Sequence, residues 1–119
     1  MRRLRRKVSD ERVLAAMAFV PRERFVPAQL QARAYDDVAL PIGHGQSISQ
    51  PTIVAVMLEA LAVGPADHVL DVGTGSGYQA ALLSRLTAHV TGVERLPIWS
   101  TVLDMCSARS PATTTWSCT

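Results

Sequence analysis

The stretch Val69-Leu70-Asp71-Val72-Gly73-Thr74-Gly75-Ser76-Gly77 decides the fold class of this 119-residue chain. A short apolar run ends in three glycines at alternate positions, and an apolar pattern of helical spacing follows. Glycine suits such a turn because a Cβ disfavours positive φ and keeps a ligand away from the backbone. The stretch therefore predicts a strand at 68–72, a ligand-approaching turn at 73–77 and a helix over about 78–87.

A second apolar run, Val90-Thr91-Gly92-Val93, completes a predicted β-α-β unit and is followed directly by Glu94. Glu94 lies about 20 residues after the first glycine, where an acidic side chain can bind ribose hydroxyls. The spacing is Gly-x-Gly-x-Gly, which differs from the Gly-x-Gly-x-x-Gly of dinucleotide-binding folds. A dinucleotide oxidoreductase is therefore the least favoured function, and the turn is similar to the first motif of S-adenosylmethionine-dependent methyltransferases.

Composition favours one small α/β domain, because 48% of the residues are hydrophobic and only 5% are aromatic. Five of the 12 basic residues lie in the first seven positions, which leaves seven basic against 10 acidic residues in the rest. A basic start can touch nucleic acid or anionic lipid. A solvated, flexible terminus over residues 1–9 is the favoured interpretation, so we expect no nucleic-acid partner.

The sequence also disfavours a secreted protein, a membrane-spanning protein and a zinc-binding protein. A secretory signal needs an uninterrupted apolar core of about 7–15 residues, and Ser9-Asp10-Glu11-Arg12 interrupts the first apolar run. No segment approaches the roughly 20 apolar residues of a membrane span. Cys106 and Cys118 lack zinc-site spacing. We therefore expect a cytoplasmic, monomeric protein with no membrane association and no metal site.

The amino-terminal half is predicted to contain helices joined by a polar loop. Ser9 is the expected cap of a helix that begins at Asp10-Glu11, with Val13, Leu14 and Met17 on its buried face. One helical turn fits between Pro21 and Pro27, and residues 41–51 are predicted to form a polar loop. A second helix follows from 51 to 62, and its predicted buried face consists of Ile53, Val54, Met57, Leu58 and Leu61.

The tail at 98–119 is rich in Ser and Thr and has no period, so disorder is the structural prediction. A second interpretation is a frameshift near residue 97. Back-translation with G or C at each third codon position, read one base out of register, gives LVDRARHVLGALAGHDDVEL. That sequence is an amphipathic helix, a turn and the start of a strand, which is what a Rossmann-like fold carries after Glu94.

Two separated motifs in this chain closely resemble the protein-L-isoaspartate O-methyltransferase family. They are Val20-Pro21-Arg22-Glu23-Arg24-Phe25-Val26-Pro27 with Ala34-Tyr35, and Leu40-Pro41-Ile42-Gly43-His44-Gly45-Gln46-Ser47-Ile48-Ser49-Gln50-Pro51. The segment from Val69 to Tyr78 is similar to that family's cofactor motif, and Val93-Glu94-Arg95 to its ribose-binding strand end. The resemblance covers about residues 10–97.

The resemblance implies methyl transfer from S-adenosyl-L-methionine to the α-carboxylate of L-isoaspartyl residues in damaged proteins. It implies a Rossmann-like class I methyltransferase fold with an amino-terminal helical extension, here truncated after the second strand. The expected divisions are a flexible terminus at 1–9, a helical and substrate-loop region at 10–63, the first β-α-β at 64–97 and an aberrant tail at 98–119. By resemblance Ser49 is the catalytic residue, and the cofactor-binding residues are Gln46, Ser47, Asp71, Gly73, Thr74, Gly75, Ser76, Gly77 and Glu94.

Alternatives stay open at this point. Ser49 by itself is better explained as a helix cap, and the two roles are compatible. Tyr78 packs either on the cofactor or on the sheet, and a lone loop histidine such as His44 is usually not a site residue. An inactive remnant and a methyltransferase with another substrate are the competing functions. The strand at 68–72 is expected to expose an apolar edge, which invites aggregation or mispairing. We also expect weak cofactor binding and little or no turnover, because the adenine-contacting and carboxy-terminal substrate segments that the resemblance implies are missing from this sequence.

Overall fold

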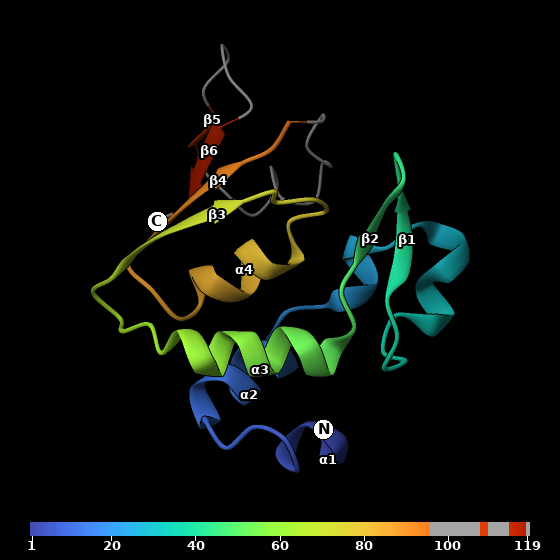
Figure 1. The fold of residues 1–119 in the computed structure, drawn as a ribbon, viewed down its shortest axis with the longest axis horizontal. Helices are drawn as coiled ribbons and strands as arrows, with labels where there is room; N and C mark the ends of the chain where they lie inside the picture. Colours follow the sequence, from blue (N-terminus) through green and yellow to red (C-terminus); the bar gives the residue numbers. More distant parts are fainter. Residues whose placement is uncertain (96–107, 110–114, 119) are drawn as a thin grey trace.

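A computed structural model describes residues 1–95, 108–109 and 115–118 of the chain. It contains a four-stranded sheet and a separate two-stranded sheet, connected by helices (Figure 1). The helices are α1 (Arg2–Arg5), α2 (Glu11–Phe19), α3 (Pro51–Leu61) and α4 (Tyr78–Ser84), with the 3₁₀ helices η1 (Arg22–Phe25) and η2 (Ala28–Arg33). The strands are β1 (Leu40–Gly43), β2 (Gln46–Ile48), β3 (His68–Val72), β4 (His89–Val93), β5 (Ala108–Arg109) and β6 (Thr115–Cys118).

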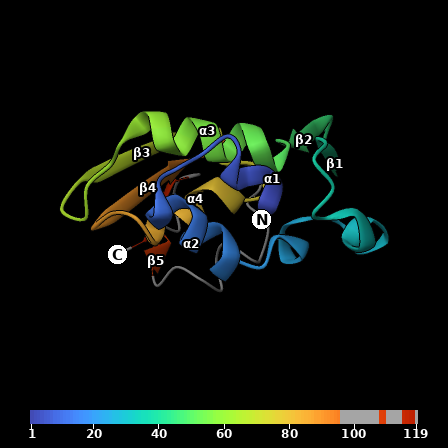
Figure 2. The same ribbon diagram turned by 90° about the horizontal axis from the view of Figure 1, so that it is seen from below.

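The predicted β-α-β unit is present. Strands β3 and β4 run parallel, with the register His68 to His89 and Val72 to Val93. Helix α4 connects them and packs against β4, with α2 and α3 beyond it (Figures 1 and 2). The strand at 68–72 is confirmed to the residue, whereas α4 ends three residues earlier than predicted. Leu82, Leu83 and Val90 are almost fully buried and form the centre of this unit.

Strand β3 lies at the edge of the larger sheet, whose order is β3-β4-β6-β5. Its alternation places Asp71 in the interior, while Leu70 and Val72 are 62% and 74% exposed. Within the described part of the chain, β4 is the one strand that pairs with β3. The predicted apolar exposure along the strand that leads to the glycine turn is therefore confirmed.

The tail differs from the prediction at six residues. Thr115–Cys118 form β6, which pairs antiparallel with β4, and Ala108–Arg109 form β5 beside it. Disorder was the wrong prediction for these residues, because the open edge of β4 offers backbone partners that a composition argument ignores. The remainder of 98–119, and with it the sequence-level evidence for a frameshift, lies outside the described residues.

The amino terminus contributes to the core. Helix α1 occupies part of the segment for which we expected a flexible chain, and Leu4 and Val8 are buried. Asp10, rather than Ser9, caps α2, and its carboxylate accepts a hydrogen bond of 2.8 Å from the Arg12 amide. Ser9 instead donates from its backbone and hydroxyl to Glu59 on α3. These bonds join the amino-terminal segment to α3.

Helix α3 buries a narrower face than predicted. Val54, Ala55 and Leu58 are buried, whereas Ile53, Met57 and Leu61 are 45%, 55% and 52% exposed. Apart from Thr52 and Glu59 the helix is apolar, so periodicity alone does not select the face that packs inward. The predicted buried face was correct for Val54 and Leu58 and wrong for the other three.

Residues 41–51, predicted as a loop, are mostly a β-hairpin. Strands β1 and β2 pair antiparallel, with Leu40 opposite Ile48, and the chain reverses at Gly43-His44-Gly45. All three turn residues have positive φ, including His44 at 54°. Leu40, Ile42 and Ile48 point into the core, which fixes the hairpin against the helices. The predicted helical turn between Pro21 and Pro27 is present as η1.

Candidate active site

The glycine turn folds back over the end of β4. The Gly73 amide donates to the Val93 carbonyl at 2.8 Å, so the turn begins beside the last residue of the neighbouring strand. Gly73, Gly75 and Gly77 have φ values of 75°, 60° and 88°. A Cβ at Gly75 would still find space, with its nearest neighbour, Ile42 Cδ1, at 3.6 Å. The backbone conformation, rather than crowding, therefore requires glycine here.

Glu94 holds the middle of the glycine turn. Its Oε2 accepts a hydrogen bond of 2.7 Å from the Gly75 amide, and only 3% of the residue is exposed. A carboxylate bound to a backbone amide in a buried site makes a charge-assisted hydrogen bond, roughly twice as strong as a neutral one. The predicted proximity of Glu94 to 73–77 is confirmed, because the side chain contacts the turn itself.

Asp71, the fourth residue of β3, is a second buried carboxylate. It is 8% exposed, and its Oδ2 has no hydrogen-bond partner among the described residues. Burial, followed by repulsion from Glu94, raises the pKa of Asp71 to about 6. The site thus contains a carboxyl group that changes its charge near neutral pH and has an unused acceptor atom.

The hairpin faces the glycine turn across a small cavity of about 110 Å³. Gln46, Ser47 and Ser49 line it on the hairpin side, and Asp71 lies on the side of β3. The turn itself contributes Gly73, Thr74, Gly75 and Ser76. The structure therefore brings together all of the predicted site residues except Gly77, which precedes α4, and Glu94, which holds the turn.

Ser49 is not the cap of α3. The cap position is Gln50, which makes no side-chain cap bond. Asp37 takes that role from the preceding loop, and its carboxylate accepts bonds of 3.0 Å and 2.9 Å from the Thr52 amide and hydroxyl. These bonds hold the pKa of Asp37 below its usual value. Ser49 is left exposed at the cavity, so the structural explanation that competed with its site role does not apply.

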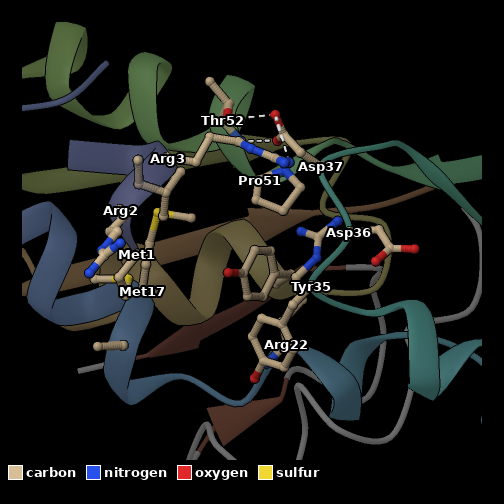
Figure 3. A pocket seen from close by; sticks show the side chains of 13 residues that line it. Met1, Arg2, Arg3, Met17, Arg22, Tyr35, Asp36, Asp37, Pro51 and Thr52 are labelled. Carbon is tan, nitrogen blue, oxygen red and sulfur yellow. Dashed lines mark hydrogen bonds and ion pairs between the residues drawn. The ribbon is translucent and has the colours of Figure 1, made fainter. Parts of the chain in front are cut away.

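Arg22 is a residue whose importance the sequence reasoning missed. It is fully buried, and burial lowers the pKa of its guanidinium. Its sequence neighbours Glu23 and Arg24 suggest a solvated charged run, so no pattern distinguishes it. It lines a larger cavity of about 630 Å³ between α1, α2 and α3, together with Arg3, Tyr35 and Asp37 (Figure 3). Tyr78 lies between the two cavities and lines both.

Tyr78 packs inside the protein. It is 3% exposed, and its ring lies 5.5 Å from that of Phe25 on η1. Burial raises the pKa of its hydroxyl.

In the described part of the chain, no cluster of three His, Cys, Asp or Glu residues is arranged to hold a metal, and no helix is long and apolar enough to span a membrane.

Comparison with known proteins identifies the family. The model of the protein-L-isoaspartate (D-aspartate) O-methyltransferase family matches residues 1–102. The chain belongs to this family. A protein-L-isoaspartate O-methyltransferase of Methanoculleus marisnigri is 62% identical over 92 residues, and one of Roseiflexus castenholzii is 58% identical over 91. These alignments cover 77% and 76% of this chain and 42% of each relative, so the chain spans less than half the length of these curated isoaspartate methyltransferases.

Solved structures agree with the fold. One, described as a protein-L-isoaspartate O-methyltransferase of Plasmodium falciparum in complex with S-adenosyl-L-homocysteine, superposes with a TM-score of 0.71 at 27% identity. The superposition covers 84% of this chain and 49% of the Plasmodium falciparum chain. A second protein-L-isoaspartate O-methyltransferase superposes with a TM-score of 0.72 at 28% identity, over 85% of this chain and 34% of the other. The predicted class, a partial Rossmann-like methyltransferase fold, is therefore confirmed.

Proposed function

We propose that this isoaspartate methyltransferase chain binds S-adenosyl-L-methionine at the glycine turn and directs methyl transfer to the α-carboxylate of L-isoaspartyl residues in damaged proteins. The observation that carries the proposal is the arrangement of the turn: Glu94 accepts a hydrogen bond from the Gly75 amide, and Ser47 and Ser49 face the turn across the small cavity. The proposed partners are isoaspartyl-containing proteins, and the proposed location is the cytoplasm.

The residues present fit this cofactor. A nucleoside can approach the backbone of the turn closely because no Cβ intervenes at Gly73 or Gly75. The unpartnered Oδ2 of Asp71 suits a cationic group, and Glu94 suits ribose hydroxyls. S-adenosylmethionine would supply the methyl group. The cavity of about 110 Å³ is smaller than the roughly 300 Å³ at the lower end of ligand pockets, so we propose that it is the floor of a larger site.

The chemistry makes modest demands on side chains. A substrate carboxylate is already ionised at pH 7, so the site needs no strong general base. It must orient the carboxylate oxygen in line with the methyl group and exclude water, which is a positional effect. We assign this task to Ser49, whose hydroxyl can hold an anion without titrating near pH 7. Gln46 and Ser47 would support it from the same hairpin.

The test combines calorimetry with S-adenosylhomocysteine and a radiolabelled methyl-transfer assay on an isoaspartyl peptide. We expect weak binding and slow transfer, because the cavity of about 110 Å³ encloses only part of a ligand of this size. Ser49→Ala should abolish transfer and retain cofactor binding, whereas Ser84→Ala, remote on α4, should change neither. Equal transfer to the normal aspartyl peptide would favour a methyltransferase with another substrate. Absence of cofactor binding would favour an inactive remnant.

A further inference from the structure

Arg22 connects three segments that are distant in sequence. Its Nε donates to the Ala34 carbonyl at 2.5 Å, and its Nη2 donates to the Ser49 carbonyl at 2.8 Å. Its guanidinium carbon lies 4.9 Å from the centroid of the Tyr78 ring. One side chain therefore contacts the end of η2, the residue that follows β2 and the first residue of α4.

Two of these contacts belong to opposite walls of the small cavity. Ser49 lies on the hairpin side, and Tyr78 follows Gly77 directly at the end of the glycine turn. A guanidinium is a planar, rigid fork, so the bond from Nη2 to Ser49 and the position over the Tyr78 ring fix two directions at once. The spacing between the hairpin and the turn is thus set in part by a group that contributes no atom to the small cavity.

The local network holds Arg22 in place. Its backbone amide donates to the Tyr35 hydroxyl at 3.1 Å, and that hydroxyl donates to the Glu23 carboxylate. Burial and the neighbouring Glu23 raise the pKa of Tyr35 to about 12, so the hydroxyl keeps its proton at physiological pH. The loop around Tyr35 therefore braces η1.

Keeping a charged group in this position is unfavourable in terms of stability alone. Arg22 is 0% exposed, and its partners are two carbonyl oxygens and an aromatic ring, while Nη1 has no hydrogen-bond partner in the described chain. Buried cations that lack full compensation are destabilising compared with apolar residues of similar volume. An apolar side chain would stabilise the protein at least as well at this position, so stability alone does not explain Arg22.

We propose that Arg22 is a positioning residue, which sets the Ser49 loop against the glycine turn and so preorganises the cofactor and substrate site. This inference rests on the proposed function, because it assigns Arg22 a task in that same site. Arg22 does not contact the reacting groups; it acts through the Ser49 carbonyl and the Tyr78 ring. A lysine lacks the planar fork whose Nε and Nη2 donate to the Ala34 and Ser49 carbonyls from fixed positions, and an apolar side chain donates to neither.

The test uses the full chain and two variants, Arg22→Ala and Arg22→Lys. Hydrogen exchange of the amides at 46–50 reports the order of the loop, and calorimetry reports the affinity for S-adenosylhomocysteine. We expect about tenfold faster exchange at 46–50 and about tenfold weaker binding in both variants. In Arg22→Ala, 10 mM ethylguanidinium should restore both, because the deleted side chain borders a cavity of about 630 Å³, whereas 10 mM ethylammonium should not.

Arg2→Ala is the matched control, since it removes the same charge from the larger cavity without touching Ser49 or Tyr78. It should leave both measurements unchanged. The proposal is overturned if Arg22→Lys exchanges and binds as the wild type does, or if Arg22→Ala loses thermal stability with uniformly faster exchange and no rescue. Should Arg22→Ala fail to fold, Arg22→Lys alone decides. If the wild type does not bind the nucleoside, the proposed function fails, while the exchange measurement still decides whether Arg22 orders the loop.

Discussion

The stability of Asp71→Asn relative to the wild type should increase as the pH rises from acid to neutral. The pKa of Asp71 rises from 3.8 to about 6 on folding, because the carboxylate is buried beside Glu94. The folded state therefore binds its proton more tightly than the unfolded state does. By linkage, this group's favourable contribution is complete below pH 3.8 and is lost as the pH rises through about 6.

The size of the effect follows from that shift. Two pKa units at 1.36 kcal/mol each give a maximum of about 3 kcal/mol, of which about 2 kcal/mol falls between pH 4 and pH 7.5. Asparagine removes the charge but adds an amide that lacks a partner, and that penalty does not depend on pH. The difference between the two pH values is therefore the quantity to measure, rather than stability at one pH.

Urea unfolding of the wild type and of Asp71→Asn at pH 4 and pH 7.5 provides the measurement. The free energy of unfolding of the variant minus that of the wild type should be about 2 kcal/mol more favourable at pH 7.5 than at pH 4. Asp36→Asn, which removes a carboxylate in an exposed ion pair with Arg33, is the control. A difference of zero for Asp71→Asn would refute the reasoning that burial and Glu94 raise the pKa of this carboxyl.

Three further predictions concern stability and solubility. Glu94→Ala removes a buried charge-assisted bond to the Gly75 amide and should lower the free energy of unfolding by about 2 kcal/mol; Glu11→Ala, at an exposed ion pair, should have little effect, and equal losses in both would contradict the assignment. Asp37→Ala removes the side chain that caps α3 and should lower the melting temperature, at a cost of about 1 kcal/mol, as measured by circular dichroism; an unchanged melting temperature would show that Thr52 finds another partner. Val72→Lys places a charge on the exposed side of β3 and should raise the concentration at which light scattering first detects aggregates, and an unchanged threshold would show that aggregation begins elsewhere.

The strand, turn and strand around the glycines could be predicted from sequence because each is a local signal. Glycines at alternate positions after an apolar run allow the positive φ values of a tight turn. The sequence distance from the first glycine to Glu94 corresponds to one β-α-β crossover. The hairpin could not be predicted in this way, since β1 and β2 are only four and three residues long. Strands this short give too few positions to establish an alternation.

The other differences arise from tertiary partners. Ser9 and Asp10 are both good caps by residue type, and Ser9 is diverted because Glu59, 50 residues away in sequence, accepts its hydrogen bonds. Asp37 caps α3 through Thr52, which lies 15 residues further along the sequence. Arg22 is indistinguishable by type from its exposed neighbour Arg24, and its role follows from contacts with the Ala34 and Ser49 carbonyls and the Tyr78 ring. The roles of the site residues in binding and catalysis stay predictions.

Strand β3 leads into the proposed cofactor-binding turn and is also the strand with an exposed edge that can promote aggregation. The glycine turn begins where β3 ends, and the strand's outer backbone is left without a neighbour in the described chain. Any nucleoside that occupies the turn stabilises β3 by mass action and reduces the population of opened molecules. The supply of that small molecule would then determine how long the polypeptide stays dispersed in solution, whatever its rate of turnover.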